Sequence, residues 1–110
     1  MIIEQRTYTI KPLRTHDFIS LYERSALALQ RQYLARMIGF YTSEVGTLNQ
    51  VVHLWAYDSL EDRDARRKAM QSDPGWPFYL KALQDLDIVI SQESKILRPV
   101  SFSPPVPAST

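Results

Sequence analysis

The 110-residue sequence contains no cysteine and only two histidines. Without cysteine, the chain can form no disulfide, thiolate nucleophile, iron–sulfur cluster or cysteine-type zinc site. Two histidines also argue against a histidine-rich metal centre. We therefore expect neither a metal nor a cofactor.

Strong charge and long apolar runs are also missing. Thirteen basic and twelve acidic side chains leave a formal charge of +1, too little to hold a polyanion, so we expect no nucleic acid partner. No run approaches the roughly 18 apolar residues of a membrane span. The N-terminus, Met1 to Arg6, is charged at once and is unlike a signal peptide. These absences predict a soluble, cytoplasmic protein of one domain.

The first half of the chain predicts a strand, a helix and a hairpin. Residues 2–10 are rich in β-branched and aromatic types and stop before Pro12, as a strand would. Apolar residues then recur at helical spacing from Thr15, the candidate N-cap, to the region of residues 34–37. Residues 38–46 and 50–57 predict two strands joined by a turn that contains glycine and asparagine.

The second half predicts two short helices and a last strand. Ser59 to Asp62 has the form of a capping box, and the charge run that follows reads as the solvated face of a helix. After a break at residues 72–75, Asp73 caps the next helix, with Pro74 at its first position. Residues 87–97 form the last strand.

The order β-α-β-β-α-β, with the second helix split, predicts an α+β ferredoxin-like sandwich. We assign residues 1–99 to this domain and residues 100–110 to a proline-rich C-terminal tail.

The two faces of the hairpin differ in character. Side chains alternate across a strand, so pairing inward from a four-residue turn sorts them into two sets. The pairs are Glu44 with Val51, Thr42 with His53, and Phe40 with Trp55. One set is bulky and mixed: Phe40, Thr42, Glu44, Val51, His53, Trp55 and Tyr57. The other is compact and apolar: Tyr41, Ser43, Val45, Val52, Leu54 and Ala56.

We assign the compact set to the side covered by helices. The bulky set would then be an apolar patch larger than a soluble monomer tolerates. A second copy of the sheet, packed face to face about a two-fold axis, would cover it and enclose a cavity. A homodimer through the sheet face is therefore expected.

The same alternation places Glu4, Arg6 and Tyr8 on the cavity side of the first strand. Arg6, Glu44 and His53 would share an enclosed face and shift one another's pKa. These three are the catalytic candidates. The expected ligand-binding set is Arg6, Tyr8, Phe40, Thr42, Glu44, His53 and Trp55.

Each candidate also has a structural interpretation. His53 could be a general base, an axial ligand to haem iron, or a hydrogen-bonded strand histidine. Glu44 could be a catalytic carboxylate or the ion-pair partner of Arg6. Arg63 is interpreted as a surface or helix-to-loop contact, without a catalytic role, and His16 as exposed.

Several segments resemble the NIPSNAP family. They are Glu4 to Tyr8, the stretch Leu48-Asn49-Gln50-Val51-Val52-His53-Leu54-Trp55-Ala56-Tyr57, Arg63, and Asp73-Pro74-Gly75-Trp76. The resemblance implies a dimeric α/β barrel, a superfamily that includes cofactor-free monooxygenases, isomerases and haem-binding dehydratases. It implies no settled reaction. This sequence departs from the family at Gln5 and at Leu13, where a glycine is common.

The leading expectation is a protein that binds a small, partly apolar molecule in a cavity. No phosphate loop, nucleophile elbow or metalloprotease motif occurs, which lowers the expectation of an enzyme and leaves that question open. The alternatives are a non-catalytic protein-interaction module and a cofactor-free monooxygenase- or isomerase-like enzyme.

Overall fold

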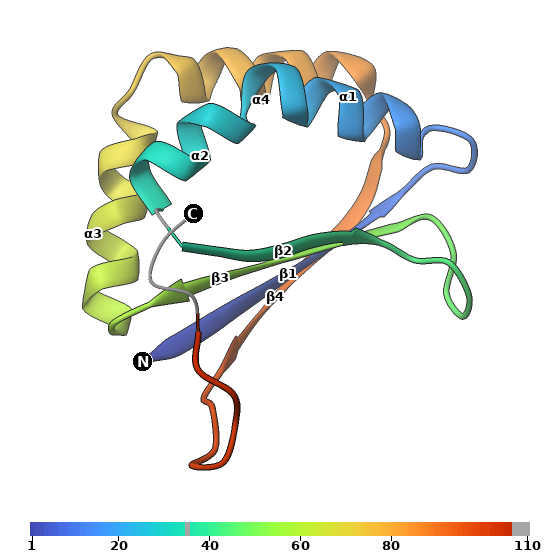
Figure 1. Ribbon diagram of the computed structural model, residues 1–110. Coiled ribbons are helices and arrows are strands. Elements are labelled where there is room, and N and C mark those ends of the chain that lie inside the picture. Colours follow the sequence, from blue (N-terminus) through green and yellow to red (C-terminus); the bar gives the residue numbers. More distant parts are fainter. Residues whose placement is uncertain (35, 107–110) are drawn as a thin grey trace.

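Four helices lie on one side of a single antiparallel sheet (Figure 1). The computed structural model describes residues 1–34 and 36–106. The strand order is β2-β3-β1-β4, which confirms the ferredoxin-like α+β fold. The elements are β1 (Ile2–Ile10), α1 (Thr15–Ser25), α2 (Leu27–Leu34), β2 (Arg36–Thr42), β3 (Gln50–Tyr57), α3 (Leu60–Gln71), α4 (Gly75–Leu86) and β4 (Val89–Leu97).

The first helix is divided, which the sequence pattern did not predict. Ala26, with φ −124°, separates α1 from α2, and the two helices run at an angle to each other (Figure 1). The reason lies in their partners, because α1 packs against α4 whereas α2 packs against α3. Thr15 is the first helical residue, and its side chain does not cap the helix.

The hairpin forms, with β3 as predicted, but β2 runs over Arg36–Thr42 and not over residues 38–46, and the register differs. Thr42 pairs with Val51 and Phe40 with His53, two residues from the expected pairing. The expected four-residue turn was wrong because residues 43–49 leave the ladder, with Gly46 and Asn49 in the left-handed conformation that these types tolerate. A shift of two residues keeps every side chain on the same face.

α3 begins as its sequence indicates, whereas α4 begins at Gly75, one residue after the predicted first position at Pro74. The Ser59 hydroxyl accepts a hydrogen bond from the Asp62 backbone N–H at 3.0 Å. Asp73 accepts from the Gly75 backbone N–H at 2.8 Å and from the Tyr33 hydroxyl at 2.8 Å. Asp73 therefore ties the start of α4 to α2.

The assignment of the sheet faces was wrong. The bulky face lies beneath the helices, where Val51, Trp55 and Tyr57 have no exposed surface. Large side chains fill the space between sheet and helices, whereas the compact set is too small to do so. The side facing away from the helices carries Ile3, Gln5 and Thr7 of β1, Tyr41 of β2, Val52, Leu54 and Ala56 of β3, and Lys95 and Leu97 of β4.

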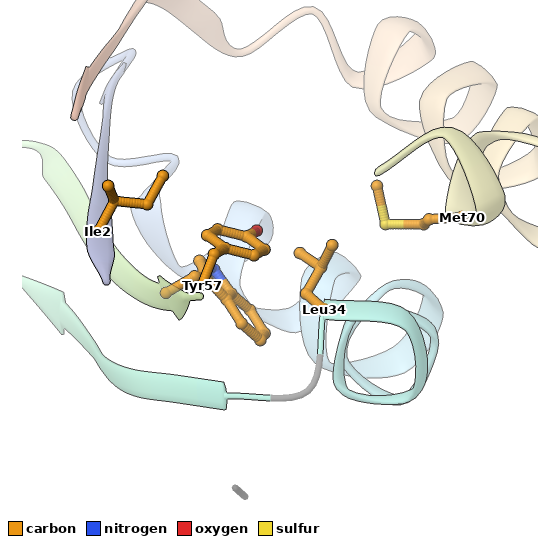
Figure 2. Close-up of a cluster of buried hydrophobic side chains, with 5 residues drawn as sticks. Ile2, Leu34, Tyr57 and Met70 are labelled. Atoms are coloured by element: carbon orange, nitrogen blue, oxygen red, sulfur yellow. The ribbon is translucent and has the colours of Figure 1, made fainter. Parts of the chain in front are cut away.

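Apolar clusters pack the two ends of the helix-covered face. At one end, Ile2 and Tyr57 point from the sheet toward Leu34 and Met70 on the helices (Figure 2). At the other end, Ile10 and Val51 pack with Phe18 and Ile88, among others. Polar side chains occupy the strand positions between these ends. No helix in the described part of the chain is long and apolar enough to cross a membrane.

Candidate functional site

A cleft of about 570 Å³ lies between the helices and the sheet. Its sheet side is formed by Arg6 and Tyr8 of β1 and His53 of β3. α3 contributes Arg67, and α4 contributes mainly apolar and aromatic side chains. The latter are Trp76, Tyr79, Leu80 and Leu83. The cleft thus combines an apolar wall with a small set of polar groups, as binding sites for small molecules do.

His53 is the most enclosed polar residue of the cleft, with 1% of its surface exposed. Its ring stacks on Phe40 with centroids 4.6 Å apart. The rings of Tyr8 and Tyr22 lie 5.6 and 6.0 Å from it. The indole Nε1 of Trp55 lies 2.8 Å from His53 Nδ1. Four aromatic side chains therefore fix the orientation of this imidazole.

The bond from Trp55 determines which nitrogen of His53 carries the proton. An indole N–H can only donate, so His53 Nδ1 accepts and the single proton of the neutral ring is on Nε2. Burial, followed by the positive charge of Arg6, lowers the pKa of His53 to about 3, so the ring is neutral at pH 7. Nε2 is buried and has no hydrogen-bond partner among the described residues.

Glu4 is the centre of a buried ionic cluster beside the cleft. Arg63 of α3 binds its carboxylate through two nitrogens, at 3.1 and 2.9 Å, and Arg6 donates at 3.2 Å. Ser94 of β4 donates to the same carboxylate. Burial alone would raise the pKa of Glu4, but hydrogen bonds from Arg63 and Ser94 and the charges of both arginines lower it to about 2.

Arg67 faces the same region one helical turn after Arg63. Its Nη1 is buried and has no hydrogen-bond partner in the described part of the chain. Burial, followed by the positive charge of Arg6, lowers the pKa of Arg67. The guanidinium remains charged at neutral pH, in surroundings that disfavour its charge. The hydroxyl of Tyr57 is likewise buried without a described partner.

Tyr22 and Tyr79 also line the cleft. The hydroxyl of Tyr22 donates to the side-chain oxygen of the buried Gln30 at 2.6 Å. Tyr79 meets the Tyr22 ring edge-on, and Trp76 lies next to Tyr79. Burial raises the pKa of both tyrosines, so their hydroxyls stay protonated. They form the aromatic wall of the cleft.

The structure brings together five of the seven residues in the expected ligand-binding set. Arg6, Tyr8 and His53 line the cleft directly. Phe40 and Trp55 contact His53 and hold it in place. That any of them binds a ligand stays a prediction.

Glu44 and Thr42 do not join this group. Glu44 is exposed in the loop of residues 43–49, and Thr42 is exposed at the end of β2. The expected pairing of Arg6 with Glu44 was therefore wrong, because the ladder ends before Glu44 and the carboxylate beside Arg6 is that of Glu4. Glu4 had been placed on the correct face, but its ion pair was not foreseen.

Sequence reasoning missed the two arginines of α3. The charge run of residues 61–68 was interpreted as a solvated face, and the pair of Asp62 with Arg66 at 2.9 Å fits that view. Arg63 and Arg67, however, turn toward the sheet. Their spacing of four residues places both on one helical face, and this was the available signal.

The fold and the cleft define a class of protein. It is an α+β domain of the ferredoxin-like type, with helices on one face of a four-stranded sheet and a polar, aromatic-lined cleft between the layers. The family model described as NIPSNAP matches residues 3–104. The chain belongs to the NIPSNAP family.

Individual relatives support this membership. The chain is 35% identical over 100 residues to Protein NipSnap homolog of Dictyostelium discoideum, covering 90% of this chain and 43% of that protein. It is 31% identical to human Protein NipSnap homolog 3A, covering 84% of this chain and 37% of that protein. The chain thus spans less than half the length of these curated relatives.

Solved structures resemble the chain more completely. An uncharacterized NIPSNAP-like domain protein from Burkholderia xenovorans is 40% identical, with a TM-score of 0.91 over 99% of this chain and 93% of that one. A putative antibiotic biosynthesis monooxygenase from Nitrosomonas europaea is 14% identical, with a TM-score of 0.66 over 91% of this chain and 99% of that one. The second likeness concerns the fold alone.

Proposed function

We propose that the protein binds a small, partly apolar molecule in the cleft between its helices and its sheet. The observation that carries this proposal is the Nε2 of His53, a residue that lines the cleft: this hydrogen-bond donor is buried and has no partner among the described residues. Leaving such a donor unsatisfied costs about 1–3 kcal/mol. An acceptor brought by a ligand would recover that free energy.

The cleft dimensions and lining agree with binding. A volume of about 570 Å³ lies within the range of small-molecule sites, roughly 300–1,000 Å³. Trp76, Tyr79 and Leu83 offer apolar contact on one side, and Arg6 and His53 offer polar contact on the other. A ligand with both an apolar body and a polar group suits this division.

The hydrogen bond of His53 favours binding over the two chemical roles considered for this residue. A histidine that ligates a metal usually donates its other N–H to an oxygen. Here the other nitrogen accepts, from Trp55. To act as a base or as a ligand to haem iron through Nε2, His53 would have to move its proton to Nδ1, against the Trp55 N–H.

Two naphthalene probes, 2-naphthoate and the neutral 2-naphthamide, test cleft binding. We expect saturable binding by titration calorimetry, with ¹H–¹⁵N chemical-shift changes centred on Tyr79 and Leu83. Leu80→Trp, at the rim, should weaken binding of both probes at least fivefold. Phe78→Trp is the matched control on the exposed face of α4 and should leave binding unchanged. Failure of both probes to bind, or equal effects of the two variants, would refute the proposal.

The expected homodimer is retained, with the interface moved to the face of the sheet away from the helices. This face carries an apolar group of Ile3, Tyr41, Val52, Leu54 and Leu97. Glu93 and Lys95, 3.6 Å apart, lie on the same face of the edge strand β4. A two-fold axis brings a patch against itself, so neighbouring charges of opposite sign can pair across it. We therefore propose a second copy of this chain as the partner.

A further inference from the structure

The polar groups of the cleft have an excess of positive charge. Arg6 and Arg67 line the cleft, and Arg63 lies beside it. The buried carboxylate of Glu4 is already bound by Arg6, Arg63 and Ser94. Asp87, the one carboxylate among the residues that line the cleft, has 87% of its side chain exposed and pairs with Lys11.

Arg67 is the cation that this arrangement leaves without an anion. The two oxygens of Glu4 face Arg63 and Arg6, and Arg63 also pairs with the exposed carboxylate of Asp64 at 2.9 Å. Two carboxylates therefore serve three guanidinium groups, and neither forms an ion pair with Arg67 among the described residues. The Nη1 of Arg67 is buried, with no hydrogen-bond partner in the residues described. A buried charge without a partner is unfavourable unless something of opposite sign joins it.

His53 supplies a second donor to the same cleft. Because Trp55 occupies Nδ1, His53 presents an N–H from Nε2 and no lone pair. A hydrogen-bond acceptor that carries negative charge would pair with both the Arg67 guanidinium and the His53 N–H. A neutral amide or alcohol could satisfy His53 but would leave the charge of Arg67 uncompensated.

We propose that the ligand of the cleft is an apolar molecule with an anionic oxygen group, of which a carboxylate is the simplest, held by Arg67 and by His53 Nε2–H. This inference rests on the proposed function and adds the chemical class of the ligand. Arg6 contributes charge from the floor of the cleft, while its nitrogens are engaged with Glu4 and the Tyr8 hydroxyl. The aromatic wall around Tyr79 receives the apolar body.

The two naphthalene probes separate this inference from cleft binding as such. They share one shape, and only 2-naphthoate is charged at pH 7.5. We expect 2-naphthoate to bind at least tenfold more tightly than 2-naphthamide, the difference that one charge-assisted hydrogen bond supplies. Raising the salt concentration from 50 to 500 mM should reduce this preference.

Arg67→Gln should remove the preference. Affinity for 2-naphthoate should fall about tenfold, whereas affinity for 2-naphthamide should stay within twofold and so report an intact cleft. Arg67→Lys should restore part of the loss. The matched control is Lys68→Gln, which removes the same charge from an exposed neighbour on α3. It should leave both affinities unchanged.

Three results would overturn the inference. Equal affinity of the chain for both probes would mean that the cleft binds apolar molecules without regard to charge, and the proposed function would stand alone. A preference for 2-naphthoate that survives in Arg67→Gln would place the anion elsewhere. If neither probe binds, the proposed function and this inference are both refuted.

Discussion

A single hydrogen bond determines the chemistry available at His53. With Nδ1 occupied by the Trp55 indole, the imidazole is a donor toward the cleft at neutral pH. The stacked Phe40 ring and near-complete burial keep it uncharged. His53, one of the three catalytic candidates of the sequence analysis, thus lines the cleft, and the role proposed for it is recognition of a ligand.

The low pKa of His53 makes stability depend on pH. The folded-state pKa, about 3, lies below the ordinary value of 6.5, so the unfolded chain binds the proton first as pH falls. The stabilisation that comes from keeping His53 neutral in the fold is complete above pH 6.5 and is lost as the pH falls toward 3. We expect the free energy of unfolding by urea to decrease by roughly 2 kcal/mol between pH 7 and pH 5.

His53→Gln should remove most of this decrease, because glutamine does not titrate. His16→Gln, at the exposed second histidine, should keep it. Measurements stay above pH 5 because the stabilisation that the ionised Glu4 provides is itself lost below about pH 4.5, the ordinary pKa of that carboxyl group. If the free energy of unfolding falls equally with pH in both variants, His53 is not the source of the pH dependence.

Leu13 shows strain at the level of one residue. Its φ is +69°, in the left-handed region that a leucine enters only at a cost of about 1–2 kcal/mol, and its side chain is almost fully exposed. The resemblance to the NIPSNAP family implies a glycine at this turn, and the backbone conformation explains why. The chain keeps the turn despite the leucine.

At the scale of elements, Arg63 and Glu4 fasten α3 to β1. The bidentate contact joins residues 59 positions apart, and Ser94 extends it to β4. Ile2 of β1 and Met70 of α3 also belong to one buried apolar cluster, with Leu34 and Tyr57 between them (Figure 2). Polar and apolar contacts therefore act together where the helical layer meets the sheet.

Arg63→Met should destabilise the fold by about 3 kcal/mol, because it leaves a buried carboxylate with reduced compensation. The acid-unfolding transition should also move to higher pH as the pKa of Glu4 rises. Lys81→Met is the control, since its pair with Asp85 is exposed and contributes about 0.5 kcal/mol or less. Chemical unfolding at pH 7 measures the loss of stability in each of the two variants. Equal losses in the two variants would show that the buried pair contributes no more than an exposed one.

For the whole molecule, the proposal is that a second copy of the chain covers the face of the sheet away from the helices. Leu54→Arg places a charge at its centre and should convert the dimer to a monomer in sedimentation equilibrium at micromolar concentration. Phe78→Arg changes an exposed apolar residue on the helical layer and should leave the dimer intact. A wild-type chain that sediments as a monomer at these concentrations would disprove the dimer.

Local patterns in the sequence were sufficient for the element order and for most boundaries. β1 and β3 have the predicted bounds, and Ser59 caps its helix as expected, because alternation, helical spacing and capping depend on neighbours in the chain. The same alternation correctly placed Glu4, Arg6, Tyr8 and His53 on one face.

Long-range packing governed the rest. Alternation separates the two faces of a sheet but does not say which one the helices cover; that depends on the volume between the layers, which Trp55 and Tyr57 fill. The arginines of α3 reach Glu4 and the cleft only because the fold brings α3 within side-chain reach of β1. Local spacing indicates which side chains share a strand or helix face, but the site forms only where these distant faces meet.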